Sequence, residues 1–380
     1  MPVGSLKNTL YGLALPVLGK RCEWPGGISD PLEKVLRKHH VVGTAIQRFE
    51  KGRLTEVHTV GYASLASKRA VGQDTIFRTA SVAKMVTALL VFRLQTKGLL
   101  NVNEDISELL GYPVRNPAYP YQAITLGMVL SHTSSIVDSA AYFASFANPT
   151  PLRTLLQAEN AFLPSAPGTV FRYSNLAAGM VGCMLENRFD MSLESLAHKE
   201  LFQPLGVMAT FDMSRLNPLQ TADSWRVLPP ALAFDAHSRI AAAKSMGEPD
   251  PEKHYLLASG SLFLTAQALA KLALTAWNGA GGFLNEESLA QMQTPLLGWP
   301  DQTVKMQHGM GLLKMDDPAV LSRPLWGHQG FAYGAVNGVF FDAQGNGFAC
   351  LNSGASERRA GHLACLNRDL IALLMKENPA

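Results

Sequence analysis

Cysteine and charge are both scarce in this sequence. Only four cysteines occur among 380 residues, and they stand without C-x-x-C spacing at Cys22, Cys183, Cys350 and Cys365. This pattern favours neither a zinc site nor a disulfide framework. Charged residues make up 17% of the chain, the formal net charge is +3, and no lysine- or arginine-rich run occurs. The composition therefore argues against a nucleic-acid-binding protein.

An apolar run long enough for a membrane span is also missing. The N-terminal segment has one lysine before a weak apolar stretch, which Asn8, Tyr11 and Gly12 interrupt. This segment is a poor match to a signal peptide, and it predicts no membrane span. We therefore expect a cytoplasmic protein, or a periplasmic or extracellular one if a leader was trimmed.

Several well-known catalytic motifs are absent. No G-x-S-x-G occurs, which disfavours a conventional Ser-His-Asp hydrolase. No H-E-x-x-H, P-loop or G-x-G-x-x-G after a strand occurs either, so the sequence predicts no metal, nucleotide or other cofactor. We expect the tandem His39-His40 to be a solvated helix end rather than a metal site.

Hydrophobic residues make up 47% of the chain, and their spacing predicts strands near both ends with helices between them. Alternating patterns predict strands over 41–49, 54–63, 309–315, 335–342 and 347–354. Helical patterns begin at Asp30-Pro31, after residue 77 and at residue 362. The expected fold class is α/β (α+β), with one antiparallel sheet formed by the N- and C-terminal segments, flanking helices and an inserted, mostly helical domain.

The same pattern divides the chain into parts. We expect an N-terminal extension over 1–29, a sheet domain over 30–98 and 306–380, and a mostly helical domain over 99–305. A cleft between the two domains is the expected place for a functional site.

The helix that follows residue 77 begins with a serine and a lysine three residues apart, Ser81 and Lys84. About one S-x-x-K is expected by chance in a chain of this composition. Taken alone, Ser81 is more typical of a helix N-terminus than of a nucleophile. One helical turn nevertheless places Lys84 on the same face as Ser81, within reach of its hydroxyl.

Two further short motifs fit the same cleft. Tyr173-Ser174-Asn175 lies in a loop of the helical region, and His328-Gln329-Gly330 lies at the start of a returning strand. A serine and lysine at a helix start, a tyrosine and asparagine from the helical domain, and an H-x-G on a sheet edge would together enclose this cleft.

With these motifs in this order, the chain resembles the serine β-lactamase and penicillin-binding-protein superfamily. It is most similar to the class C-like branch of D,D-peptidases, D-aminopeptidases and family VIII esterases. The pattern of the family is S-x-x-K, Y-x-N and K/H-x-G. Further segments that resemble the branch are VLSHTSSI (129–136), PGTVFRYSN (167–175), LFQPLG (201–206) and ASGSLFLTAQALAKL (258–272). The resemblance runs from about residue 30 to 375.

The resemblance implies a serine hydrolase that forms an acyl-enzyme on Ser81. A serine hydroxyl is a poor nucleophile until a neighbouring group takes its proton. Lys84 and Tyr173 are the two candidates for this general base, and the sequence does not choose between them.

The resemblance also assigns the groups that bind substrate. Asn175 would hydrogen-bond the lysine and a substrate amide, while the backbone N–H of the nucleophile and that of Phe331, just after Gly330, would form the oxyanion hole. His328 replaces the lysine of true β-lactamases and is mostly neutral at pH 7, which disfavours β-lactamase activity. We expect Phe331 and Tyr333 to narrow the acyl pocket.

The expected substrates are small carboxylic esters or amides and peptides that contain D-amino acids. One alternative is an acyltransferase or peptide cyclase on the same scaffold, and another is a non-hydrolytic β-lactam-binding sensor or scaffold protein. The only partner predicted is a small-molecule ester, amide or peptide, and the oligomeric state stays open. We expect His132 to be structural, satisfying buried loop carbonyls.

Overall fold

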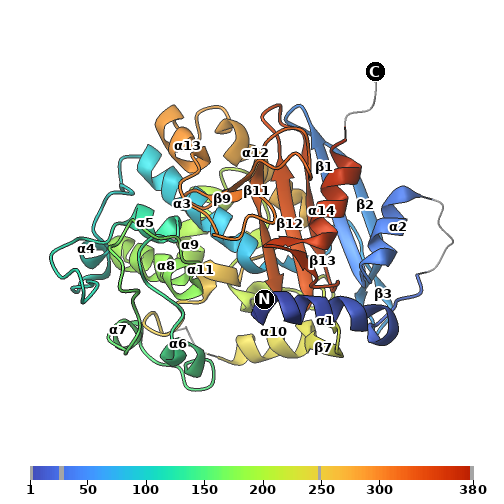
Figure 1. Cartoon of the computed structure of the whole chain (residues 1–380), viewed down its shortest axis with the longest axis horizontal. Helices are drawn as coiled ribbons and strands as arrows, with labels where there is room; N and C mark the ends of the chain where they lie inside the picture. The colour runs from blue at the N-terminus through green and yellow to red at the C-terminus, as the bar shows by residue number, and fades with distance from the viewer. Residues whose placement is uncertain (1–2, 25–29, 247–249, 377–380) are drawn as a thin grey trace.

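An eight-stranded antiparallel sheet forms the middle of the molecule (Figure 1). The computed structural model describes residues 3–24, 30–246 and 250–376. In spatial order the strands are β3 (Arg69–Ala70), β2 (Arg53–Ser64), β1 (Gly43–Glu50), β13 (Gly347–Asn352), β12 (Ala335–Phe341), β11 (Leu325–Ala332), β10 (Leu313–Met315) and β9 (Met306–His308). Strand β1 from the N-terminal part pairs with β13 from the C-terminal part. The predicted fold class is therefore confirmed.

Neighbouring residues in the central strands belong to different hydrophobic clusters. Ala45 and Ile46 of β1 are both fully buried but pack into separate clusters, and so do Ala349 and Cys350 of β13. Successive side chains of a strand point to opposite faces of a sheet. Both faces of the sheet are therefore covered.

Helices from distant parts of the chain cover these two faces. On one face, α2 (Pro31–Lys38) packs against α14 (Cys365–Leu374), and α14 contacts β12. On the other face, α12 (Ala266–Asn278) contacts β1, β12 and β13. Helix α3 (Ala83–Thr96) belongs to the same cluster as α12, and nearly all of its side chains are buried. The start of α3 thus lies deep in the molecule.

The middle of the chain is mostly helical and surrounds α8 (Asn175–Phe189), which contacts α4, α5 and α11. The remaining helices are α1 (Val3–Leu18), α4 (Ile106–Leu110), α5 (Leu126–Leu130), α6 (Ala140–Ala144), α7 (Leu152–Leu156), α9 (Leu193–Ala197), α10 (Ala236–Ser245), α11 (Leu257–Gly260) and α13 (Glu286–Gln293), with short helical turns η1 (Ala80–Val82), η2 (His198–Phe202) and η3 (Met213–Arg215). Small sheets are formed by β4 (Phe77–Arg78), β5 (Ala209–Thr210) and β8 (Phe263–Leu264), by β6 (Ser224–Val227) and β7 (Pro230–Phe234), and by β14 (Arg359–Ala360) and β15 (Leu363–Ala364). The division into domains at 98 and 306 stays a prediction.

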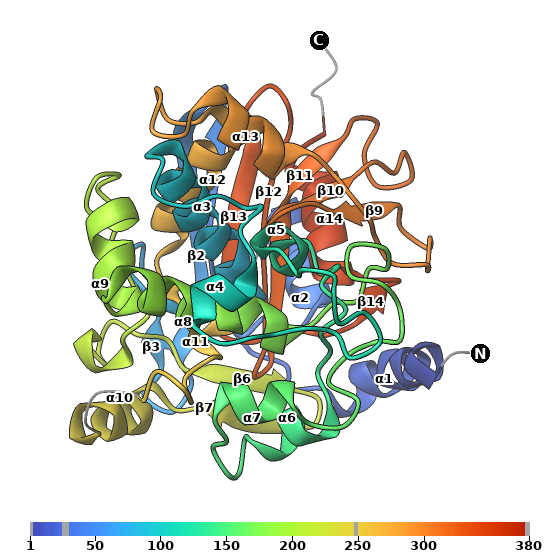
Figure 2. The same cartoon turned by 90° about the vertical axis from the view of Figure 1, so that its left-hand side faces the viewer.

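Two local features differ from the sequence analysis. Residues 3–18, expected only as an extension, form helix α1 at the edge of the molecule beside β14 (Figures 1 and 2). His39 and His40 are buried rather than solvated. Both rings have polar partners there: His39 Nε2 lies 2.7 Å from Asp369 Oδ2, and His40 Nδ1 lies 3.1 Å from the Lys20 carbonyl oxygen.

Across the described ranges, no helix combines the length and the apolar character needed to cross a bilayer.

Candidate active site

Ser81 lies where strand β4 gives way to helix α3. The chain passes through the short turn η1, and Ala80 just before Ser81 has a left-handed φ of +52°. Left-handed backbone costs a residue with a Cβ about 1 kcal/mol. The Ser81 hydroxyl caps neither η1 nor α3, since neither helical start has a side-chain cap. Instead Ser81 Oγ accepts a hydrogen bond of 3.1 Å from Lys84 Nζ.

Lys84 is 5% exposed, and its Nζ has three neutral hydrogen-bond partners. Besides Ser81 Oγ, Nζ donates to Asn175 Oδ1 at 3.0 Å and to the Ser259 carbonyl at 2.8 Å. These three contacts fix the position of Nζ. Nζ also lies 5.0 Å from the centre of the Tyr173 ring. The structure therefore brings Ser81, Lys84, Tyr173 and Asn175 together, as the motifs predict.

Asp138, which no motif indicated, holds the start of α8 in place. Its carboxylate accepts hydrogen bonds from Ser174 Oγ (2.9 Å), from the backbone N–H groups of Asn175 (3.1 Å) and Leu176 (2.9 Å), and from Asn175 Nδ2 (3.0 Å). A carboxylate is also favoured near a helix N-terminus, where the helix dipole is positive. Because Nδ2 of Asn175 is held by Asp138, its Oδ1 is directed to Lys84.

Replacing Asp138 by asparagine should release Asn175. An amide at this position offers one oxygen to four donors, so we expect kcat to fall about tenfold on an ester substrate while KM changes little. The matched control is Asp105→Asn, because Asp105 caps α4 in the same way and lies outside the cleft. That control should lower the melting temperature without changing kcat. Equal kcat values for the two variants would contradict a positioning role for Asp138.

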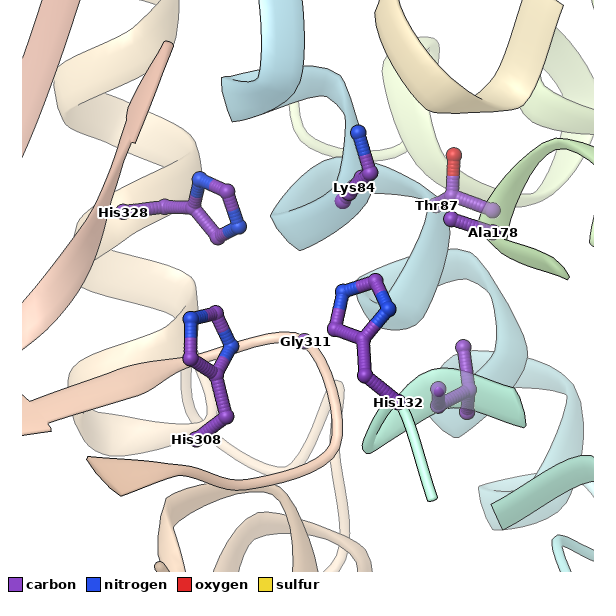
Figure 3. A pocket seen from close by; sticks show the side chains of 8 residues that line it. Lys84, Thr87, His132, Ala178, His308, Gly311 and His328 are labelled. Carbon is purple, nitrogen blue, oxygen red and sulfur yellow. The ribbon is translucent and has the colours of Figure 1, made fainter. Parts of the chain in front are cut away.

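Three buried histidines surround a small cavity beside Lys84 (Figure 3). The ring centres of His132 and His308 lie 5.5 Å apart, and those of His308 and His328 lie 5.9 Å apart. The cavity has a volume of about 10 Å³, which is room for one water molecule. Burial lowers the pKa of His328 to about 3, and it lowers the pKa of His132 and of His308 well below the usual range of histidine. All three rings are therefore neutral near pH 7.

His132 is a buried packing residue, as expected, but its hydrogen-bond partner differs from the expected loop carbonyls. Its Nδ1 accepts a hydrogen bond of 3.3 Å from the Ser174 backbone N–H, so it satisfies a donor rather than loop carbonyls. Its ring packs against that of Tyr173, with the centres 4.4 Å apart. The packing of the His132 ring thus helps to fix the position of the Tyr173 ring.

Strand β11 lies directly against the Ser81 turn. A Cβ added to Gly330 would lie 2.6 Å from the Thr79 carbonyl oxygen and 2.8 Å from the Ser81 nitrogen, so only glycine fits there. Phe331, the next residue, lines the cleft in front of Ser81. Tyr333 does not line the cleft, contrary to expectation, because it lies in the β11–β12 turn with the Arg78 guanidinium 4.7 Å from its ring centre. Of Phe331 and Tyr333, only Phe331 therefore narrows the acyl pocket.

The cleft has a volume of about 320 Å³ and is lined by Ser81, Tyr173, Asn175, Trp299, His308, Leu313, His328, Gln329, Phe331, Arg359 and His362. Five of the predicted side chains are among these residues. Sequence reasoning missed Trp299, His308, Arg359 and His362, none of which lies in a short motif. The Trp299 and His362 rings are stacked with their centres 4.4 Å apart. The described residues contain no group of histidine, cysteine or acidic side chains arranged to hold a metal ion.

The sheet flanked by helices, with a serine and a buried lysine beside strand β11, defines a protein of the serine β-lactamase and transpeptidase fold. The chain belongs to the β-lactamase family, because the family model described as Beta-lactamase matches residues 29–365. The superfamily inferred from the motifs is therefore confirmed. Known members of this superfamily include serine peptidases and esterases.

Individual relatives are more distant. Penicillin-binding protein 4* of Bacillus subtilis (strain 168) is 27% identical over 214 residues, which are 54% of this chain and 45% of that protein. The chain spans less than half the length of the first curated relatives that it matches. The octameric penicillin-binding protein homologue from Pyrococcus abyssi has a TM-score of 0.72 at 20% identity, covering 100% of this chain and 78% of the other. EstCE1, a hydrolase with promiscuous acyltransferase activity, has a TM-score of 0.73 at 19% identity, and the match covers 96% of this chain and 99% of that chain. These structures share the fold.

Proposed function

We propose that the protein is a cofactor-free serine hydrolase of the class C-like branch, which cleaves small esters or D-amino-acid-containing amides and peptides through an acyl-enzyme on Ser81. The observation that carries this proposal is the position of Lys84 Nζ, which contacts Ser81 Oγ at 3.1 Å and Asn175 Oδ1 at 3.0 Å beside an open cleft. A buried lysine held on a serine hydroxyl by neutral acceptors is suited to proton transfer rather than to ion pairing.

The proposed reaction has two steps. In the first, Ser81 Oγ attacks the carbonyl carbon while its proton passes to Lys84 or Tyr173. The backbone N–H groups of Ser81 and Phe331 stabilise the oxyanion. The proton then passes to the leaving alcohol or amine as its bond to the carbonyl carbon breaks. In the second step water attacks the acyl-enzyme, gives its proton to the same base and releases the acid.

The test is time-resolved intact mass spectrometry of the protein with p-nitrophenyl butyrate. We expect a transient adduct with the mass of one butyryl group, which peptide mapping places on Ser81 and which decays at the rate of turnover. A label on another residue, or turnover without any adduct in rapid-quench samples, would contradict the acyl-enzyme on Ser81. An acyl adduct that persists without hydrolysis would favour the alternative of a non-hydrolytic β-lactam-binding sensor.

Acyl transfer is the second candidate, because EstCE1 shares the fold and is a hydrolase with promiscuous acyltransferase activity. The aromatic walls of the cleft, Trp299 and Phe331, offer apolar contact to an acceptor alcohol or amine. Adding an alcohol such as benzyl alcohol to the same assay separates the two activities. A transferase gives the benzyl ester as the main product, whereas a hydrolase still gives mostly the free acid.

The charge of the cleft favours some of the proposed substrates over others. Arg359 is the only permanently charged residue among the described residues that line it, and no carboxylate lines it. The Arg359 guanidinium lies 3.7 Å from the centre of the Phe331 ring. His328 is neutral and does not compete for an anion. A substrate with a free carboxylate should therefore bind better than one with a free amine, which is the group that D-aminopeptidase substrates carry.

Replacing Arg359 by glutamine should remove this preference. With p-nitrophenyl esters of matched length, we expect the wild type to prefer an acyl chain that ends in a carboxylate over one that ends in a methyl group. Arg359→Gln should lower the ratio of their kcat/KM values about tenfold, as expected for a lost charge-assisted hydrogen bond. Hydrolysis of the methyl-ended ester serves as the control and should stay within about twofold of the wild type. An unchanged ratio would exclude Arg359 as the anion-binding group.

A further inference from the structure

Helix α1 is apolar on two opposite sides. On its inner side Leu15 is 6% exposed and packs with Val42 and Val227. On its outer side Leu10, Leu13 and Val17 are 57%, 71% and 81% exposed. Positions i, i+3 and i+7 lie on one face of a helix, so these three side chains form a continuous apolar stripe. A helix that is apolar on both sides usually has a partner on each.

A basic groove runs beside this outer stripe. Residues 8–18 contain no charged side chain. The groove next to them has a volume of about 310 Å³ and is lined by Gly12 and Leu13 of α1 together with four cations and one carboxylate, which are Lys38, Arg358, Arg359, Arg368 and Asp369. The side chains of Lys38 and Arg368 are 63% and 42% exposed. Exposed Lys20 and Arg21 follow the end of the helix. Asp369 pairs with Lys38 at 2.7 Å and with Arg368 at 3.7 Å, and the four cations still leave the groove with a net positive charge.

We propose that α1 and the basic groove bind the surface of an anionic lipid bilayer. The stripe formed by Leu10, Leu13 and Val17 enters the boundary between headgroups and acyl chains, and the groove cations Lys38, Arg358 and Arg368 contact lipid phosphates. An interfacial helix buries its apolar face at the boundary between headgroups and acyl chains while basic side chains contact anionic lipids. Here neighbouring elements, among them α2 and α14, supply the basic side chains. Each lysine or arginine near an anionic membrane strengthens binding measurably. Figure 2 shows α1 at the periphery, where a flat surface can reach it.

A second copy of this chain fits the same surface less well. A stable protein interface buries about 800 Å² on each partner, which is more than three side chains on one helix offer. A symmetric dimer through this stripe would also bring two basic grooves together, and like charges at an interface oppose association. A lipid surface supplies negative charge and needs no shape complementarity.

The protein surface formed by α1 and the basic groove lies next to the cleft. Arg359 lines both the groove and the cleft, and its backbone accepts a hydrogen bond of 2.6 Å from Asn8 Nδ2 of α1. Attachment through α1 would therefore hold the cleft beside the lipid headgroups. The inference does not depend on the proposed chemistry, since it concerns binding alone.

Vesicle flotation tests the inference. We expect the wild-type protein to float with vesicles of phosphatidylcholine mixed with phosphatidylglycerol, and not with vesicles of phosphatidylcholine alone. Leu13→Glu should lower the affinity at least about tenfold, because it places a carboxylate in the stripe. Arg368→Glu should lower it several-fold, and added salt should weaken the binding of the wild type. The matched control is Leu219→Glu, because Leu219 is 73% exposed and lies outside α1 and the groove.

The readouts separate loss of binding from loss of folding. Leu13, Val17 and Leu219 line neither the cleft nor the histidine cavity. Turnover of p-nitrophenyl butyrate and melting temperature should therefore match the wild type in Leu13→Glu, Val17→Glu and Leu219→Glu. Equal vesicle binding by Leu13→Glu, Val17→Glu and the wild type would overturn the inference. So would equal binding to neutral vesicles, or a dimer in sedimentation that Leu13→Glu dissociates, because that dimer would assign the stripe to a second copy.

Discussion

Ser81→Ala should lose about ten-thousandfold or more in kcat/KM on p-nitrophenyl butyrate and form no acyl adduct. A nucleophile has no substitute within the cleft, so its removal leaves only the rate that binding and the oxyanion donors provide. The fold should survive, because the Ser81 hydroxyl makes one hydrogen bond, from Lys84, and caps no helix. A change of about 1 kcal/mol in the free energy of unfolding is the expected size for that bond.

A serine that truly caps a helix provides the contrast. Ser192 precedes α9, and its Oγ accepts a hydrogen bond of 3.3 Å from the Ser195 backbone N–H. Ser192→Ala should cost about 1 kcal/mol of stability and leave the activity unchanged. If Ser81→Ala behaves in the same way, with lower stability and normal turnover, then Ser81 is only a helix start and the proposed mechanism fails.

The sheet and the three motifs were accessible to sequence reasoning for physical reasons. Strand-like apolar patterns at both ends of the chain, with helices between them, predict one antiparallel sheet built from the two termini. The pairing of β1 with β13 forms this sheet. The S-x-x-K lies where a strand pattern changes to a helical one, and such a junction places Ser81 at the start of a helix. Local spacing alone then predicts that Lys84 faces Ser81.

The rest of the site depends on contacts that no local pattern encodes. Asp138 and Asn175 are 37 residues apart, and their hydrogen bond exists only because two loops meet. Arg359 and Trp299 reach the cleft from segments without a catalytic motif. His39 is buried by Asp369, which lies 330 residues later in the chain. Helix α1 escaped prediction because apolar residues on two sides of a helix show no clear period of 3.6.

Lys84 and Tyr173 can be distinguished by their conservative removal. The Ser81 hydroxyl is hydrogen-bonded to Lys84 Nζ, whereas Tyr173 makes ring contacts with Lys84, His132, Trp299 and His308. We therefore expect Lys84→Ala to lower the rate of acylation about a thousandfold or more, in the range that a general base supplies. Tyr173→Phe keeps the ring packing and removes only the hydroxyl, so its effect should be smaller, about tenfold to a hundredfold. Rapid-quench mass spectrometry measures acylation directly.

Chemical rescue separates the role of Lys84 as base from its role in packing. Removing the side chain leaves Asn175 Oδ1 and the Ser259 carbonyl without their donor, so part of the loss is structural. Methylamine can occupy the vacated space, donate to these two oxygens and take the Ser81 proton. We expect it to restore acylation in Lys84→Ala with a dependence on the concentration of free amine, and to leave Tyr173→Phe unaffected. If methylamine fails while Tyr173→Phe proves the slower variant, the tyrosine is the base and Lys84 serves to hold Asn175 and Ser81 in position.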